Sequence, residues 1–236
     1  MRRVLIGTPC HDSKPHARYV HSLCQAIRLC TVVGIELREL MPCGIALVQE
    51  ARNGIWRDAL RHGFDDLIFI DADQDFEADW IPKLLMYPVD CVGAAVRRKD
   101  MREMYNVKAR GGPSSITIDP HTGLMTAPDM ALGTGFIRFS RKALQTLWDN
   151  SEEYDTFLSD SPSRWIFDVR PYKGELRGED TYVSDRLREF GIPTWVDPKM
   201  TCGHMGEFRY IGDFADFLQR AQAAEAAEQK PALKVV

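Results

Sequence analysis

The segment from Leu67 to Asp75 constrains the fold of this chain more than any other feature, because a short apolar run ends there in three carboxylates at alternating positions. Leu67 to Ile70 are four consecutive branched or aromatic residues, a pattern typical of a strand buried on both faces of a parallel sheet. Open parallel sheets bind their ligands at the carboxyl ends of their strands. The sequence therefore puts Asp71, Asp73 and Asp75 where a binding site is expected.

Acids this close together repel one another unless a cation or hydrogen bonds compensate their charge. Carboxylate oxygens are the ligands that Mg²⁺ and Mn²⁺ prefer, so a metal and phosphate site is one interpretation of the segment. A solvated turn with helix-capping acids is the other interpretation. For Asp75 we favour the second and expect it to cap a helix that begins near Ala78.

Strand and helix patterns alternate over the first hundred residues, which predicts an α/β fold with a Rossmann-like, mostly parallel sheet flanked by helices. The pattern then changes to a hairpin at 116–126, which predicts an antiparallel addition to the sheet. The last predicted strand is short, Thr194–Val196. The chain has neither a G-x-G-x-x-G turn after its first strand nor a Walker loop, so neither of these phosphate-binding motifs applies.

Composition narrows the class of protein. The chain has 236 residues, a formal net charge of −4, a pI near 5.9 and 44% hydrophobic residues, ordinary values that do not indicate a polyanionic partner. We expect residues 1–220 to form one domain and residues 221–236, rich in Ala, Glu and Gln, to form a flexible tail. The sequence shows no signal peptide and no apolar stretch near the roughly 20 residues that span a bilayer, so we expect a cytoplasmic protein without a transmembrane segment. The six cysteines lack the paired short spacing of zinc or redox motifs.

Motifs at four further places give the carboxylates a context. They are Ala51-Arg52-Asn53, Leu132-Gly133-Thr134-Gly135-Phe136, Glu179-Asp180-Thr181 and Cys202-Gly203-His204. With Asp71-Ala72-Asp73 among them, this order resembles the common core of the GT-A fold glycosyltransferases, in particular the family-two-like branch. The resemblance extends over about Val4 to Gly206.

The resemblance implies a glycosyltransferase that moves a sugar from a nucleotide-sugar donor, which we expect to be UDP-linked, to an acceptor hydroxyl. It also implies a divalent metal, Mn²⁺ or Mg²⁺, that neutralises the charge developing on the leaving diphosphate. Asp73 is expected to ligate this metal directly. Asp71 is expected to bind the ribose or to hold a metal-bound water, and His204 to complete the metal shell, although a lone histidine is more commonly structural.

Asp180 is the expected catalytic base of an inverting reaction, and a retaining outcome stays open. Because Glu179 and Asp180 begin a predicted helix, stabilisation of the helix dipole is the structural alternative. Together with Asp71, the residues expected to contact the nucleotide sugar are Thr8, Pro9, Arg52, Asn53, Gly133, Thr134, Gly135 and Glu179. The glycines would let the chain lie against the donor without a side chain in the way, or they could equally form a tight turn before a strand.

Two other classes of protein remain open from the sequence. A strand ending in D-x-D also resembles the haloacid-dehalogenase phosphatases, and a non-catalytic module that binds a nucleotide sugar or glycan is a further alternative. The acceptor is unassigned and can be a glycan, lipid, protein or nucleic acid. A basic loop runs from Arg97 to Arg110. We expect it to close over the donor diphosphate; the alternatives, in order, are that it binds an anionic acceptor or that it is a solvated surface. The segment from Asn150 to Arg177, with Trp165, Phe167 and Tyr172, is a candidate aromatic floor for the acceptor, or alternatively a surface loop pinned by a few apolar anchors.

Overall fold

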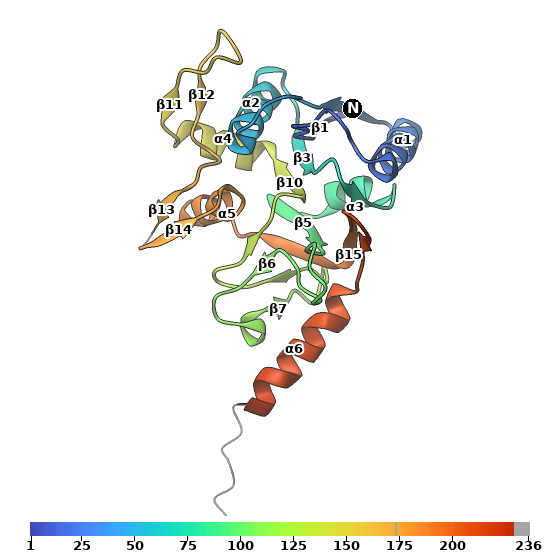
Figure 1. Ribbon diagram of the computed structural model, residues 1–236. Coiled ribbons are helices and arrows are strands. Elements are labelled where there is room, and N and C mark those ends of the chain that lie inside the picture. The colour runs from blue at the N-terminus through green and yellow to red at the C-terminus, as the bar shows by residue number, and fades with distance from the viewer. Residues whose placement is uncertain (173, 229–236) are drawn as a thin grey trace, which may run out of the picture.

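A computed structural model of the protein describes residues 1–172 and 174–228. Its central sheet is made of β1 (Arg2–Gly7), β2 (Ile35–Leu40), β3 (Asp66–Ile70), β5 (Cys91–Val96), β7 (Thr117–Ile118), β8 (Met125–Thr126), β10 (Phe136–Ser140) and β15 (Trp195–Met205). The strands lie in the order β2-β1-β3-β10-β5-β15-β8-β7 (Figure 1).

Helices and shorter strands complete the chain. The helices are α1 (Ala17–Val32), α2 (Val48–Arg61), α3 (Trp80–Met86), α4 (Arg141–Asp149), α5 (Glu179–Glu189) and α6 (Phe214–Glu228), with a 3₁₀ turn at Pro113–Ser115. The short strands are β4 (Gln74–Asp75), β6 (Val107–Lys108), β9 (Ala131–Leu132), β11 (Glu153–Tyr154), β12 (Ser163–Arg164), β13 (Arg170–Tyr172), β14 (Glu175–Arg177) and β16 (Arg209–Tyr210).

The direction of the strands confirms the predicted fold class. β1 runs parallel to β2 and β3, and β5 runs parallel to β15. β10 lies between β3 and β5 and is antiparallel to both, and β7 and β8 add antiparallel strands at the far edge. The protein is therefore an α/β structure with a mixed sheet. Because β10 is antiparallel to both β3 and β5, these two strands run in the same direction. β1 is parallel to β3, so β1, β3 and β5 all end at the same edge of the sheet.

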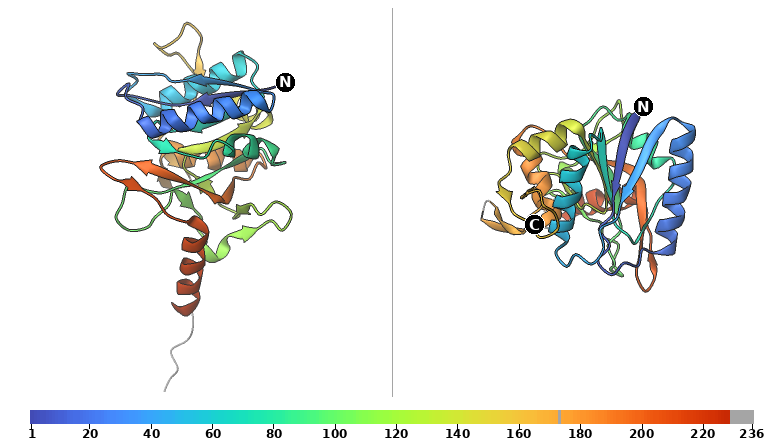
Figure 2. Two further views of the ribbon diagram at one scale, coloured as in Figure 1. Left: turned by 90° about the vertical axis from the view of Figure 1, so that its right-hand side faces the viewer. Right: turned by 90° about the horizontal axis from the view of Figure 1, so that it is seen from above.

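Helices cover both faces of the sheet (Figure 2). Alternate residues of a strand point to opposite faces, so Leu67 and Phe69 of β3 pack in the core beneath α2, α4 and α5, while Ile68 and Ile70 pack in the core beneath α1 and α3. Every residue of β3 is buried. This is the structural reason for the uninterrupted apolar run before the acids.

β15 corrects the sequence-based prediction of a short strand at Thr194–Val196. The strand continues to Met205, past an irregularity in its pairing between Asp197 and Thr201. Pro198 lies within this irregularity, which explains why the sequence pattern breaks there. His204 consequently lies on the strand itself, paired with Gln74 of β4, and does not follow the strand.

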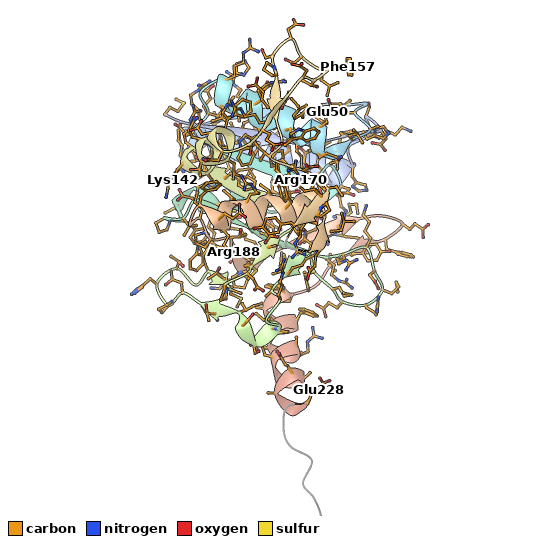
Figure 3. The ribbon with its side chains drawn as sticks, turned by 90° about the vertical axis from the view of Figure 1, so that its left-hand side faces the viewer. Glu50, Lys142, Phe157, Arg170, Arg188 and Glu228 are labelled. Carbon is orange, nitrogen blue, oxygen red and sulfur yellow. The ribbon has the colours of Figure 1, made fainter. Side chains whose placement is uncertain are left out.

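Two elements project from the body of the molecule. α6 extends away from the sheet, with Glu228 at its far end, and the β11–β12 hairpin carries Phe157 at its tip (Figures 1 and 3). Residues 221–228, which the sequence predicted as part of a flexible tail, are the second half of α6. The rest of the predicted tail, 229–236, lies outside the described residues. No helix in the described part of the chain has the length and apolar character needed to cross a membrane.

Candidate functional site

Asp71 and Asp73, which follow β3, line a cavity of about 580 Å³. The cavity lies at the edge of the sheet where β1, β3 and β5 end. The loop after β1, the start of α2, the end of β15 and the loop after β5 form its walls. The lining residues are Pro9, Cys10, His11, Asp12, Lys14, His16, Val48, Arg52, Asp71, Ala72, Asp73, Lys99, His204 and Met205. The structure thus brings Asp71, Asp73, Arg52 and His204 together, as the motifs predicted.

A buried guanidinium organises one side of this cavity. Arg52, only 5% exposed, donates from Nη2 to Asp71 Oδ1 at 3.0 Å and from Nη1 to Glu179 Oε1 at 2.8 Å. Because α2 carries Arg52 and α5 carries Glu179, this double ion pair ties two helices to the end of β3. Arg52 therefore orients the two acids, since its terminal nitrogens are already used by them.

Asp73 lies on the other side and has two basic partners at one oxygen. Its Oδ2 is 2.5 Å from Lys99 Nζ and 3.3 Å from His204 Nε2. Burial raises the pKa of the Asp73 carboxyl, but the hydrogen bonds from His204 and Lys99 outweigh burial and bring the pKa down to about 2. Asp73 is therefore an anion at any pH near neutrality.

His204 is oriented in the manner of a metal ligand. The carbonyl oxygen of Arg97 lies 2.7 Å from His204 Nδ1, and since a carbonyl only accepts, Nδ1 carries the hydrogen. The Nε2 atom faces Asp73 Oδ2; it donates to that oxygen only as the imidazolium, and it would ligate a metal only as the neutral ring. A hydrogen bond of this kind from the far nitrogen is the usual support of a ligating imidazole.

One carboxylate oxygen and one imidazole nitrogen fit a divalent cation that takes its other ligands from phosphate and water, as Mg²⁺ commonly does. Asp71 does not join this pair, because Arg52 holds it. Among the described residues no three His, Cys, Asp or Glu side chains are arranged to hold a metal. The donor set thus suits a metal that arrives with a nucleotide diphosphate better than a permanently bound ion.

Two other candidate side chains, Thr8 after β1 and Asn53 on α2, are hydrogen-bonded within the protein itself. The hydroxyl of Thr8 is fully buried and shares a hydrogen bond of 2.6 Å with the Tyr19 hydroxyl. The amide of Asn53, also buried, donates to the Phe167 carbonyl at 3.1 Å and accepts from the Phe167 N–H at 2.8 Å. Neither side chain lines the cavity, whereas Pro9 does.

Asn53 also binds the segment from Asn150 to Arg177 through its contacts with Phe167. Its two hydrogen bonds hold Phe167 in the core, where the ring is fully buried under the Arg52 guanidinium at 5.9 Å. Trp165 stacks on Tyr154, with 4.1 Å between the ring centroids. Phe167 is therefore an anchor of the segment, and it is not available as part of an open aromatic floor.

The glycine loop packs behind the acids. A Cβ at Gly135 would lie 3.1 Å from Asp71 Oδ2, and the Gly135 carbonyl accepts from the Asp71 N–H at 3.0 Å. A Cβ at Gly133 would lie 2.2 Å from the Asn106 amide nitrogen. Thr134 between them is buried. These glycines therefore allow close packing against Asp71 and Asn106, and none of the three residues lines the cavity.

The first turn of α5 contains the two acids of the E-D motif. Glu179 is bound to Arg52, whereas Asp180 accepts only from the N–H of its own neighbour Thr181, at 2.7 Å. Asp180 is partly exposed and does not line the cavity. The two acids thus differ: Glu179 is fixed in an ion pair, and the Asp180 carboxylate is free of any basic partner in the described part of the chain.

Asp75 is not a helix cap, which corrects the prediction made for it. α3 begins at Trp80 and its flanking residue is Asp79. Asp75 is instead buried and bound by Arg209, with Nε and Nη2 at 2.9 and 2.8 Å from its Oδ2. It lines a second cavity of about 730 Å³ between α1 and β15. Asp75 therefore belongs to a different face from Asp71 and Asp73.

Apart from Pro9, the sequence motifs missed the residues of the loop between β1 and α1 that line the cavity. Cys10, His11, Asp12, Lys14 and His16 all lie there, and none forms a recognisable pattern. Only their position after β1 could have indicated them, because strands that run parallel end at one edge. Lys99 was included in the predicted basic loop, but its contact with Asp73 could not be read from the sequence.

Comparison with known proteins adds structures but no family. No protein-family model matches the chain, and no curated protein matches it. The similar solved structures include CMP:2-keto-3-deoxy-manno-octonic acid synthetase complexed with CTP, at 11% identity and a TM-score of 0.44 over 97% of this chain and 100% of that one. Staphylococcus aureus TarS 1–349 in complex with UDP-GlcNAc is similar at 10% identity and 0.43, over 98% of this chain and 67% of that one.

A glycosyltransferase involved in glycosylation of the major capsid of PBCV-1 is also similar, at 9% identity and a TM-score of 0.36, over 63% of this chain and 66% of that one. The fold class itself rests on the order and direction of the strands, and the chemistry on the side chains of the cavity.

Proposed function

We propose that this protein is a transferase that uses a nucleotide-sugar donor, and more specifically a metal-dependent glycosyltransferase with a UDP-linked donor. The observation that carries the proposal is the pair of acids at the end of β3, Asp71 and Asp73, each matched with basic groups around one cavity of about 580 Å³. A cavity of this size accommodates a nucleotide-sized ligand. Its mixed charge suits a diphosphate that is bound together with a cation.

Each side chain has a stated task in this proposal. Asp73 and His204 hold Mn²⁺ or Mg²⁺, which neutralises charge on the leaving diphosphate. Asp71, kept in place by Arg52, accepts hydrogen bonds from the ribose hydroxyls. Glu179, held by the same guanidinium, fixes the first turn of α5 relative to these groups.

Asp180 is the proposed general base. Since no basic side chain in the described residues pairs with it, its carboxylate is free to accept the proton of an acceptor hydroxyl. An acceptor that approaches from the α5 side, opposite the diphosphate, would give inversion at the anomeric carbon. The acceptor itself is left unassigned between glycan, lipid, protein and nucleic acid.

A phosphatase of the haloacid-dehalogenase type agrees less well with the geometry. Asp71 would be its nucleophile, but Asp71 Oδ1 is bound to Arg52 and its Oδ2 lies against Gly135. An oxygen held in an ion pair of this kind is a poor nucleophile, because attack would break the pair.

The test is calorimetric titration of UDP with and without Mn²⁺, followed by a screen of nucleotide sugars for hydrolysis or transfer. We expect Mn²⁺ to raise UDP affinity at least about tenfold, because the acids otherwise repel the diphosphate. Asp73→Asn should remove this gain. Asp75→Asn is the matched control, because it changes another aspartate two positions along the chain. Asp75 lines the other cavity, so this variant should keep the Mn²⁺-dependent gain in UDP affinity.

Equal UDP affinity with and without Mn²⁺ in the unmutated protein would contradict the metal assignment. If no nucleotide sugar is bound or cleaved under any condition, the proposed enzyme class is wrong.

A further inference from the structure

The cation nearest to Asp73 belongs to the protein itself. Lys99 lies in the loop after β5, and its ammonium approaches the same carboxylate oxygen, Oδ2, to which His204 Nε2 is directed. A metal ligated by Asp73 and His204 would need that oxygen. Lys99 thus stands where an incoming cation has to bind.

The loop that carries Lys99 is folded on itself and holds the lysine in this position. Arg97, only 5% exposed, donates from Nη1 to the carbonyls of Arg98, Arg102 and Met104 at 3.1, 2.7 and 3.3 Å. The Arg97 carbonyl in turn orients His204. One short segment therefore positions both the imidazole and the ammonium that meet at Asp73.

The stem of Lys99 passes beside the turn that follows β15. A Cβ at Gly206 would lie 3.4 Å from Lys99 Cδ and 3.7 Å from Lys99 Cε, so the stem runs past a residue that has no side chain. The turn therefore leaves room for the lysine stem between the loop after β5 and Asp73.

The ion pair is nevertheless easy to exchange. The side chains of Lys99 and Asp73 are 41% and 34% exposed, and ion pairs exposed to this extent contribute at most about 1 kcal/mol. A divalent cation and an ammonium repel each other at a single oxygen. Lysine has a flexible stem with a compact charge, so its ammonium can turn to a neighbouring phosphate when one is present.

We propose that Lys99 is an internal counter-ion that competes with the divalent cation for Asp73, and that a bound diphosphate relieves the competition by accepting the ammonium. This inference rests on the proposed function and adds regulation to the same site. Its consequence is that metal and nucleotide strengthen each other's binding. The protein alone binds the metal weakly, and the reciprocal gain follows from thermodynamic linkage.

The experiment is a titration of the intact protein with Mn²⁺ in the absence of nucleotide, in which free Mn²⁺ is measured by EPR. We compare the unmutated protein with Lys99→Met, which keeps the stem and removes the charge. Lys99→Met should bind Mn²⁺ more tightly, by up to about fivefold, the factor that corresponds to an exposed ion pair of at most about 1 kcal/mol. Arg98→Met is the control, because it removes one charge from the adjacent, exposed position and should behave as the unmutated protein.

A second titration adds UDP at saturation. UDP should raise Mn²⁺ affinity by a smaller factor in Lys99→Met than in the unmutated protein. Unchanged or weaker Mn²⁺ binding by Lys99→Met without nucleotide would overturn the inference. So would UDP binding that is indifferent to Mn²⁺ and lost in Lys99→Met, because the lysine would then replace the metal.

These results separate the inference from the proposed function. Mn²⁺-dependent UDP binding together with equal Mn²⁺ affinity of both proteins refutes only the competition by Lys99. Tighter Mn²⁺ binding by Lys99→Met in a protein that binds no nucleotide sugar refutes the proposed function and leaves the competition in place.

Discussion

At the scale of single residues, two neighbouring acids at the start of α5 have opposite surroundings, and this difference yields a prediction. Glu179 is bound to the buried Arg52 guanidinium, whereas Asp180 has no basic partner among the described residues. We expect Asp180→Asn to keep donor binding and to lower the transfer rate about a hundredfold to ten-thousandfold, the usual cost of losing a general base. The measurement is single-turnover transfer from the donor identified in the screen, with UDP affinity as the binding control.

Glu179→Gln should act differently, because it weakens one arm of the Arg52 ion pair and so affects binding and folding first. If Glu179→Gln abolishes transfer with binding intact while Asp180→Asn is as active as the unmutated protein, the two roles must be exchanged.

At the scale of elements, β3 and β10 are joined by a buried charge cluster at the end of the sheet opposite to the cavity. Asp66 is fully buried and accepts from Arg138 Nε at 2.6 Å and from Arg2 Nε at 2.6 Å. Removing one partner of a buried pair leaves the other charge uncompensated. We therefore expect Asp66→Ala to lower the free energy of unfolding by about 3–5 kcal/mol in urea denaturation.

Glu36→Ala is the matched control, since Glu36 pairs with Arg3 on the surface of the same region, and its urea midpoint should stay close to that of the unmutated protein. Equal effects of the two changes would show that the Asp66 cluster does not stabilise the sheet.

At the scale of the whole molecule, α6 projects from the body, and only the first half of this helix is anchored in the core. Phe214 and Leu218 are buried, and Phe214 contacts the Tyr105 ring edge-on at 5.2 Å. The second half contributes polar contacts, such as Gln222 Nε2 to the Pro113 carbonyl at 3.0 Å. We expect removal of residues 221–236 to lower the free energy of unfolding by at most about 2 kcal/mol.

Phe214→Ala in the full chain should cost more, about 3–5 kcal/mol, because it leaves a cavity in the core. Thermal and urea unfolding compare the two proteins. A truncated protein as unstable as Phe214→Ala would show that the folding unit extends beyond residue 220.

The sequence alone determined the elements with strong local patterns. β3 could be predicted from its apolar run, Leu67 to Ile70, because burial on both faces requires such a run whatever the neighbouring strand is. The carboxyl-end position of Asp71 and Asp73 followed from the same rule. The order of the motifs was also sufficient to expect Arg52 and His204 near these acids.

Only the tertiary structure decided which partner each charged side chain has. Asp73 and Asp75 are two positions apart and look equivalent in the sequence, yet one meets Lys99 and His204 while the other is bound by Arg209. Such pairs join residues that are 26 to 134 positions apart, so no local propensity encodes them. They depend on which loops the strand order brings to one edge, and this order is set by the packing of the whole sheet.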